Sequence, residues 1–336
     1  MNLLRAGVGA VLWLALGAGA LAQGKGETVR FQDYPGIGNM LVRTAIANGY
    51  CDKHGIKCEL QAIPSGPLGA QAMLAGSIDS AFIPAEIMVG AITKGAKMKM
   101  VVGGAVANTA QLIESNALPA PNAGKGWPAF MQDLKGRKIG VPARGSLMET
   151  TITWMLLKAG LKPDQVTFVA VGGPVTAYGA LVSNQVDAIV MFEPAGSMCI
   201  VLKTCRVIWR GALDQQPAEQ YALNGGGANL VFTQEYLEAH PDAIAAVIAA
   251  VKDADAFINN PANFEALMKV AERFFKFEMP KGDEVLRASL RTAVEARAYT
   301  AAINRNSVKA GLEFLVETHQ LDKAPPVTEF VYDKAP

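Results

Sequence analysis

The sequence predicts an α/β fold made of two lobes. Short apolar runs rich in β-branched residues alternate with amphipathic helical stretches almost throughout, which is typical of helices covering a mainly parallel sheet. The chain has 336 residues, of which 51% are hydrophobic, and this length exceeds what one hydrophobic core usually supports. We therefore expect two lobes with a cleft between them.

The first block of elements begins with the segment TVRFQDY. The predicted strands are short and apolar and lie at 28–34, 57–63, 80–84 and 98–104. The predicted helices have apolar residues at helical spacing and lie at 39–50, about 67–75 and about 86–93. A loop rich in Pro, Gly, Asn and Ala follows at 116–128, and this composition predicts a domain boundary.

The alternation restarts after this loop. The predicted strands lie at 137–142, 165–171, 187–192 and 206–209, and the predicted helices at 147–159, 175–183 and up to about 203. The glycine cluster NGGGAN, 224–229, closes this block, and amphipathic helices are predicted at 240–259, 263–275 and 283–300. We expect residues 23–115 and 225–336 to form lobe 1, and residues 116–224 to form lobe 2.

A weak internal repeat supports this division. Gly66-Pro67 precedes a short helix, then Asp79 and Glu86, and Gly173-Pro174 precedes a short helix, then Asp187 and Glu193. Ligands of open α/β sheets bind beyond the carboxyl ends of the strands. Two lobes of this design would therefore present equivalent loops to a shared cleft.

The first 22 residues have the features of a secretory signal peptide. Arg5 precedes an uncharged run from Ala6 to Ala22 that ends in the small residues Ala20 and Ala22. A membrane anchor is the alternative, but this 17-residue run is rich in Gly and Ala, whereas a spanning helix needs about 20 strongly apolar residues. We expect cleavage near Ala22 and an exported chain.

The charge balance argues against nucleic acid as a partner. Removing Arg5 with the signal leaves 31 − 1 = 30 basic residues against 30 acidic ones. Nucleic-acid binding depends on a basic excess or stripe, and neither is present.

The four cysteines fall in two close pairs, Cys51 with Cys58 and Cys199 with Cys205. In an oxidising compartment this spacing predicts two short-range disulfides. A metal site is the alternative, but neither pair has C-x2-C spacing and His54, His240 and His319 are scattered. We expect no metal and no other cofactor.

The segment VPARGSLMET, 141–150, contains a candidate anion site. Ser146 and Glu149 form the S-x-x-E pattern of a helix capping box. Arg144 and Gly145 immediately precede this helix start, whose free N–H groups favour an anion. Arg144 therefore either contacts a ligand or forms a surface salt bridge.

Other predicted strand-end turns add candidates on both sides of the cleft. Tyr34 and Gly36 follow the first strand, and Ser65 and Gly66 follow the second. Phe192 and Glu193 end the strand 187–192; Glu193 either accepts from a ligand or interacts with the following helix dipole. No G-x-S-x-G motif is present and no histidine falls on a strand-end loop, so the sequence shows no catalytic constellation.

Three segments carry a resemblance to a known family. PSGPLGAQAMLAGSIDSAFIPAE, DLKGRKIGVPARGS and ALVSNQVDAIVMFEPA resemble the periplasmic substrate-binding proteins of nitrate/sulfonate/taurine-type ABC importers, over roughly residues 28–320. The resemblance implies a type II periplasmic-binding fold with two crossovers, a monomer that closes on a small-molecule ligand and then docks on a membrane permease. It places Tyr34 to Gly36, Ser65, Gly66, Ala85, Arg144 to Ser146, Gly173 and Glu193 at the cleft.

Relatives of this family include thiamine-pyrimidine synthases, which carry a clustered cysteine motif and a reactive histidine that this chain lacks. We therefore predict a periplasmic receptor for an organic anion, a sulfonate or carboxylate, held by Arg144 and flanked by Tyr34 and Phe192. One alternative is a receptor for a neutral or cationic heterocycle anchored by Glu193. The other is an enzyme of thiamine-precursor biosynthesis.

Overall fold

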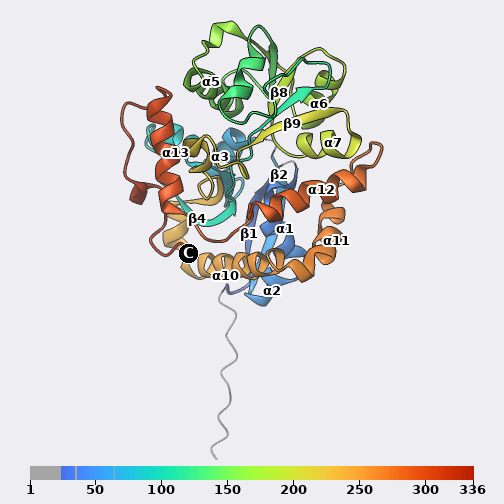
Figure 1. Cartoon of the computed structure of the whole chain (residues 1–336). Coiled ribbons are helices and arrows are strands. Elements are labelled where there is room, and N and C mark those ends of the chain that lie inside the picture. Colours follow the sequence, from blue (N-terminus) through green and yellow to red (C-terminus); the bar gives the residue numbers. More distant parts are fainter. Residues whose placement is uncertain (1–23, 35, 64) are drawn as a thin grey trace, which may run out of the picture.

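The computed structural model describes residues 24–34, 36–63 and 65–336 and contains two lobes, each built on its own sheets (Figure 1). The predicted two-lobed α/β fold is confirmed. The predicted signal peptide lies outside the described residues. Among those that are described, no helix is both long and apolar enough to cross a membrane.

Lobe 1 is built on parallel and antiparallel strand pairs. Its strands are β1 (Glu27–Asp33), β2 (Ile56–Ala62), β3 (Ala81–Ile83), β4 (Met98–Ala105) and β10 (Ala228–Thr233). β1 pairs in parallel with β2, β10 lies antiparallel between β3 and β4, and a bridge from Phe31 to Ser80 joins the two groups. The lobe 1 helices are α1 (Met40–Ala47), α2 (Tyr50–Lys53), α3 (Gly66–Leu74), α4 (Ala85–Ile92), α9 (Gln234–Ala239), α10 (Pro241–Ile258), α11 (Phe264–Phe274), α12 (Gly282–Glu295) and α13 (Arg305–Glu317).

Lobe 2 has one sheet in the order β7-β6-β8-β5-β9. Its strands are β5 (Gln111–Ser115), β6 (Lys138–Val141), β7 (Thr167–Ala170), β8 (Ala188–Met191) and β9 (Cys205–Arg210). β6, β7 and β8 are parallel, whereas β5 runs antiparallel to both of its neighbours. The accompanying helices are α5 (Leu147–Lys158), α6 (Pro174–Val182), α7 (Ala195–Leu202) and α8 (Ala218–Tyr221).

Two crossovers connect the lobes and lie side by side. Residues 106–110 lead from β4 to β5, and residues 211–227 lead from β9 back to β10. Gly225 and Gly227 donate to the carbonyl of Val106, and Gly211 donates to that of Ala110. The chain therefore passes between the lobes at a single hydrogen-bonded junction.

The first crossover begins before the predicted boundary after residue 115. The segment 111–115, which that boundary assigned to lobe 1, forms β5 in the lobe 2 sheet. The sequence does not predict β10, which begins at Ala228 inside the glycine cluster 224–229, because glycine clusters are typical of loops. The helix predicted at 39–50 ends earlier, at Ala47 in α1, and Gly49, with a φ of 71°, separates it from α2, which runs on to Lys53. The helix predicted at 283–300 ends at Glu295, since Arg297 has a φ of 46°.

The internal repeat corresponds to equivalent structure in the two lobes. The Asp79 carboxylate accepts from the backbone N–H of Arg30 at 2.8 Å, and that of Asp187 accepts from Lys138, also at 2.8 Å. Both bonds join residues 49 apart in sequence, and each links the segment before β3 or β8 to the neighbouring parallel strand. The two aspartates therefore hold the strand order that brings the strand-end loops together.

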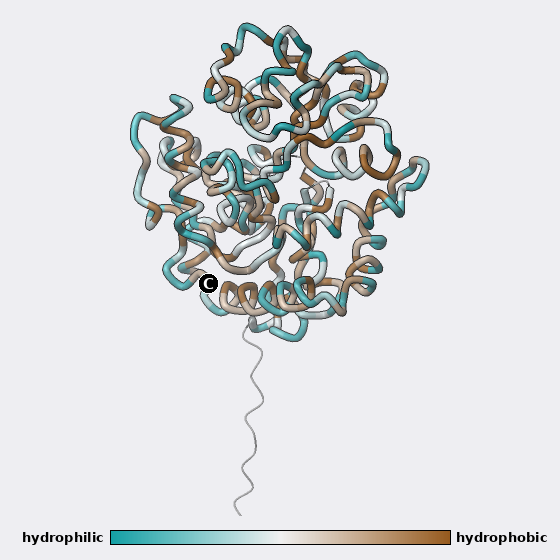
Figure 2. Tube along the Cα trace, in the orientation of Figure 1, coloured by the Kyte–Doolittle hydropathy of each residue, from teal (hydrophilic) through white to brown (hydrophobic). Residues whose placement is uncertain are grey.

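Buried apolar side chains fill both lobes, and Figure 2 shows hydrophobic stretches along the strands and alternating with hydrophilic ones around the helices. In lobe 1 the largest core packs α1 and α10 against the sheet, with Met40, Val101 and Val247 each at most 1% exposed. Both predicted disulfides are confirmed. Cys51 pairs with Cys58 and Cys199 with Cys205, at Cα–Cα distances of 6.0 and 4.9 Å.

Candidate functional site

A buried arginine fixes the loop that follows β1. The Arg43 guanidinium donates from Nε to Asp33 at 2.9 Å, from Nη1 to the Gly36 carbonyl at 2.7 Å and from Nη2 to the Tyr34 carbonyl at 3.2 Å. Its charge also lies over the Phe275 ring, 4.3 Å from the centroid. Tyr34 is half-buried, and burial raises the pKa of its hydroxyl. Tyr34 and Gly36 are therefore held in one conformation at the strand end.

A buried amide joins the next loops of lobe 1. Gln32 Nε2 donates to the carbonyls of Ile63 and Ser65 at 3.2 and 3.0 Å, and its Oε1 accepts from the Phe82 N–H at 2.9 Å. Ser65 also caps α3, because its hydroxyl accepts from Leu68 N. The predicted residues Ser65 and Gly66 thus lie at a strand end that is tied to β1 and β3.

Ala85, a third predicted residue in lobe 1, is buried at the start of α4. Glu86 follows it, and the Oε2 atom of Glu86 is shielded from solvent and has no hydrogen-bond partner among the described residues. Burial raises the pKa of this carboxyl group. Its other oxygen faces Gly311 of α13.

In lobe 2, Ser146 caps α5 and accepts from Glu149 N. The Glu149 carboxylate accepts from Gly145 N at 2.7 Å and from Arg144 Nε at 3.0 Å, one residue earlier than the usual capping box. Burial alone would raise the pKa of Glu149, but the bonds from Arg144 and Gly145 lower it. Arg144 therefore forms the surface salt bridge that was one of its two interpretations.

That salt bridge leaves the guanidinium accessible. The Arg144 side chain is 62% exposed, and its Cζ lies 5.7 Å from the centroid of Phe168 on β7. Gly145 has a φ of 74°, a left-handed conformation that favours glycine. An exposed cation thus lies next to the N-terminus of α5, although Glu149 shares that position.

The last strand-end loops of lobe 2 carry Gly173, Phe192 and Glu193. Gly173 precedes α6, and its carbonyl accepts from the Thr176 hydroxyl at 2.9 Å. Phe192 is half-buried and packs against both apolar cores of the lobe.

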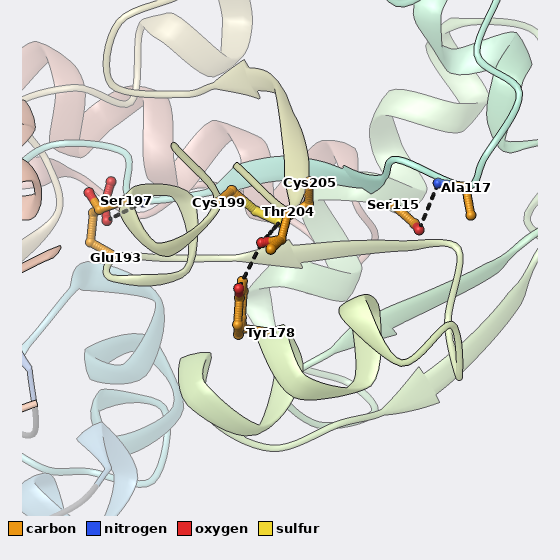
Figure 3. The surroundings of a disulfide bond; sticks show 8 residues. All are labelled: Ser115, Ala117, Tyr178, Glu193, Ser197, Cys199, Thr204 and Cys205. Atoms are coloured by element: carbon orange, nitrogen blue, oxygen red, sulfur yellow. Dashed lines mark hydrogen bonds between the residues drawn. A yellow bond between two sulfur atoms is a disulfide. The ribbon is translucent and has the colours of Figure 1, made fainter. Parts of the chain in front are cut away.

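Glu193 is held by residues of both lobes. Its Oε1 accepts from Gln111 Nε2 at 3.0 Å, and its Oε2 accepts from Ser197 N and from Ser289 Oγ, both at 3.2 Å. The bond to Ser197 satisfies an N–H in the first turn of α7, so the predicted helix-terminal interaction is present. Ser289 belongs to α12, so Glu193 also joins lobe 2 to lobe 1. Figure 3 shows Glu193 and Ser197 at one end of α7 and the Cys199–Cys205 disulfide towards the other.

A second contact between the lobes joins α5 to α13. The rings of Trp154 and Phe314 meet edge to face with centroids 6.0 Å apart, and both side chains are 4% exposed. Lys158 and Glu317 form an ion pair of 2.6 Å beside them. The two lobes that carry these strand-end loops are therefore in direct contact.

Two surface hollows lie elsewhere, on lobe 1. One is lined by α10 with Tyr332 and Lys334, the other by the start of α13 with residues 327, 328 and 331–333. None of the predicted ligand residues lines either hollow. Within the described parts of the chain, no group of three or more His, Cys, Asp or Glu side chains is placed to hold a metal ion.

Residues 39–272 match the model of the NMT1-like family. The chain belongs to this family. A protein of Brucella abortus (strain 2308) that is named as a binding protein is 27% identical over 239 residues, which cover 70% of this chain and 68% of the relative.

Solved structures share the fold at low sequence identity. The ligand-binding component of an ABC-type import system from Staphylococcus aureus has a TM-score of 0.69 at 16% identity, covering 92% of this chain and 99% of that one. The alkanesulfonate-binding protein SsuA from Xanthomonas axonopodis pv. citri has a TM-score of 0.65 at 17% identity, covering 91% and 98%. The desulfurization enzyme DSZB is also similar, with a TM-score of 0.64 at 13% identity, covering 92% and 97%. The predicted resemblance to sulfonate-type binding proteins is thus confirmed in fold.

The residues that position these loops were not found from the sequence. Gln32, Gln111 and Ser289 contact residues far away in the sequence, whereas Arg43 contacts the nearby loop after β1. No motif marks any of the four. The sequence marks Glu86 only through the repeat, where it corresponds to Glu193.

Proposed function

We propose that the protein is a periplasmic solute-binding receptor that delivers a small organic anion, a sulfonate or carboxylate, to an ABC permease. Membership of the NMT1-like family and the fold shared with ABC-type binding components support the receptor role. The observation that carries the choice of an anion is the exposed Arg144 guanidinium beside the N-terminus of α5. Both the charge and the free N–H groups of a helix start favour a negative ligand.

In this proposal the ligand is bound between strand-end loops of both lobes. Arg144, Gly145 and Ser146 hold the anionic group, and Tyr34 and Phe192 flank its apolar or aromatic body. Ser65, Gly66, Ala85, Gly36 and Gly173 contribute backbone groups. Ligand favours the closed arrangement only as far as it binds that arrangement more tightly than the open one.

The test combines a thermal-shift screen with calorimetry. A screen of sulfonates, aromatic carboxylates and pyrimidines identifies a ligand, because tight binding raises the melting temperature. Arg144→Ala should then weaken binding of the anion at least about tenfold. Arg287→Ala is a matched control, since Arg287 is also exposed and paired with a glutamate, Glu265, but lies on α12. Equal affinity in wild type and Arg144→Ala would remove Arg144 from the site.

A second candidate is a receptor for a neutral or cationic heterocycle. The observation that favours it is Glu193, whose carboxylate is oriented by three neutral donors, whereas Arg144 is partly occupied by Glu149. Tight binding of a ligand without any acidic group would establish it. The similarity to DSZB makes turnover worth measuring as well, and conversion of a bound compound by the protein alone would favour an enzyme.

A further inference from the structure

Glu193 belongs to a cluster of hydrogen-bond acceptors at the N-terminus of α7. The cluster comprises both oxygens of Glu193, the amide oxygen of Gln111 and the hydroxyl of Ser197. Gln111 and Ser197 are 5% and 0% exposed, and within the described residues neither Gln111 Oε1 nor Ser197 Oγ has a hydrogen-bond partner. Buried polar atoms are nearly always paired, because an unpaired one costs about 1–3 kcal/mol.

Both unpaired atoms lie close to the carboxylate. Gln111 donates to the Glu193 carboxylate from Nε2, the nitrogen of the same amide group, and Ser197 donates to that carboxylate from its backbone N–H. Gly196 permits this arrangement, since a Cβ at that position would overlap Gln111 Oε1. The side chain of Gln111 therefore lies directly against the start of α7.

The charge of Glu193 is not neutralised by these contacts. Its three partners are an amide, a backbone N–H and a hydroxyl, all of which are neutral donors. The carboxylate lies at the positive end of the α7 dipole. An N–H or O–H group of a ligand would pair both with this charge and with the unpaired oxygens.

Ser289 shows that the cluster faces lobe 1. Its hydroxyl, carried by α12, reaches Glu193 Oε2 from the opposite lobe at 3.2 Å. The other members of the cluster belong to β5, α7 and the loop before α7, all in lobe 2. Separation of the lobes would break this bond and open the cluster to a ligand.

We propose that Glu193, Gln111 and Ser197 form a subsite for a hydrogen-bond donor, so that the ligand carries an amine, amidine or hydroxyl group in addition to its anionic group. This inference rests on the proposed receptor function and narrows its ligand class. The hydroxyl that Ser289 donates to Glu193 from the lobe 1 side is a donor of the same kind.

The experiment compares ligands that differ only by an amino group. Calorimetry measures ethanesulfonate against 2-aminoethanesulfonate, benzoate against 4-aminobenzoate, and pyrimidine against 4-aminopyrimidine. For at least one pair, the wild-type protein should bind the amino member about tenfold more tightly, the size expected for a hydrogen bond to a charged group.

Two variants connect that preference to the subsite. Ser197→Ala removes an oxygen that has no partner in the protein, so it should reduce the preference without lowering stability, and Glu193→Gln should abolish it. Ser183→Ala is the matched control, because its hydroxyl bonds only within α6 and its cap, to Gly179 and Ala180. Three results would overturn the proposed subsite. They are equal affinities within every pair, a preference for the amino member that survives in both variants, and no binding of any amino member.

The pairs separate this inference from the proposed function. Acids that bind without any preference for the amino member would retain the anion receptor and reject the subsite. Binding of 4-aminopyrimidine alone, lost in Glu193→Gln, would retain the subsite and reject the anion.

Discussion

Gln32→Leu should destabilise lobe 1 by about 2–4 kcal/mol. The substitution keeps most of the buried volume but leaves the Phe82 N–H without its acceptor, which costs about 1–3 kcal/mol for a buried group. The carbonyls of Ile63 and Ser65 also lose a donor, and they add less because they are only partly buried. Such a loss is a large share of the 5–15 kcal/mol that typically separates folded from unfolded chains.

Equilibrium unfolding in urea measures this loss as a lower midpoint at unchanged slope. Gln61→Leu is the matched control, because Gln61 is the register partner of Gln32 on β2 and is exposed. We expect the control to change the free energy of unfolding by less than about 0.5 kcal/mol. A loss below about 1 kcal/mol for Gln32→Leu, or one equal to the control, would refute the reasoning.

Three further predictions concern the same loops and helices. Gly69→Ala places a Cβ against the Gln32 amide, so it should lower the free energy of unfolding in urea about as much as Gln32→Leu does. The double variant should lose much less than the sum of the two single losses, and additive losses would contradict a shared network. Glu149 has a lowered pKa in the folded chain, so its stabilisation is complete above the unfolded value of about 4.3 and is lost as the pH falls through the folded value. Urea unfolding from pH 3 to 6 should therefore show a flatter pH dependence for Glu149→Gln, and an unchanged dependence would count against it. Replacing Cys199 and Cys205 together by alanine should lower the free energy of unfolding by about 2 kcal/mol, and an unchanged urea midpoint would contradict this estimate.

Much of the fold was predictable because most elements have a local signal. The strand and helix alternation from residue 27 to residue 105 follows from short apolar runs and helical spacing, and the predicted bounds differ from the observed ones by a few residues. β5 and β10 were not predicted as strands, and each lies directly beside a crossover. Whether such a strand joins the sheet before it or the one after it depends on pairing with distant residues, which local periodicity does not reveal.

The candidate site was predictable only in part, for a related reason. The S-x-x-E pattern located Ser146 and Glu149 because capping is a local interaction. The role of Gln111 depends on Glu193, 82 residues away, and that of Ser289 on a contact between the lobes, 96 residues from its partner. Neither residue type nor spacing carries information about such contacts.

The position of β10 between β3 and β4 has a consequence for incomplete chains. A chain that stops before Ala228 has every strand of lobe 2 but lacks the one that fills the middle of a lobe 1 sheet. β3 and β4 would then expose bare backbone edges, which are templates for pairing with other molecules. Truncated products and partly synthesised chains should therefore be much more prone to aggregate than the whole molecule.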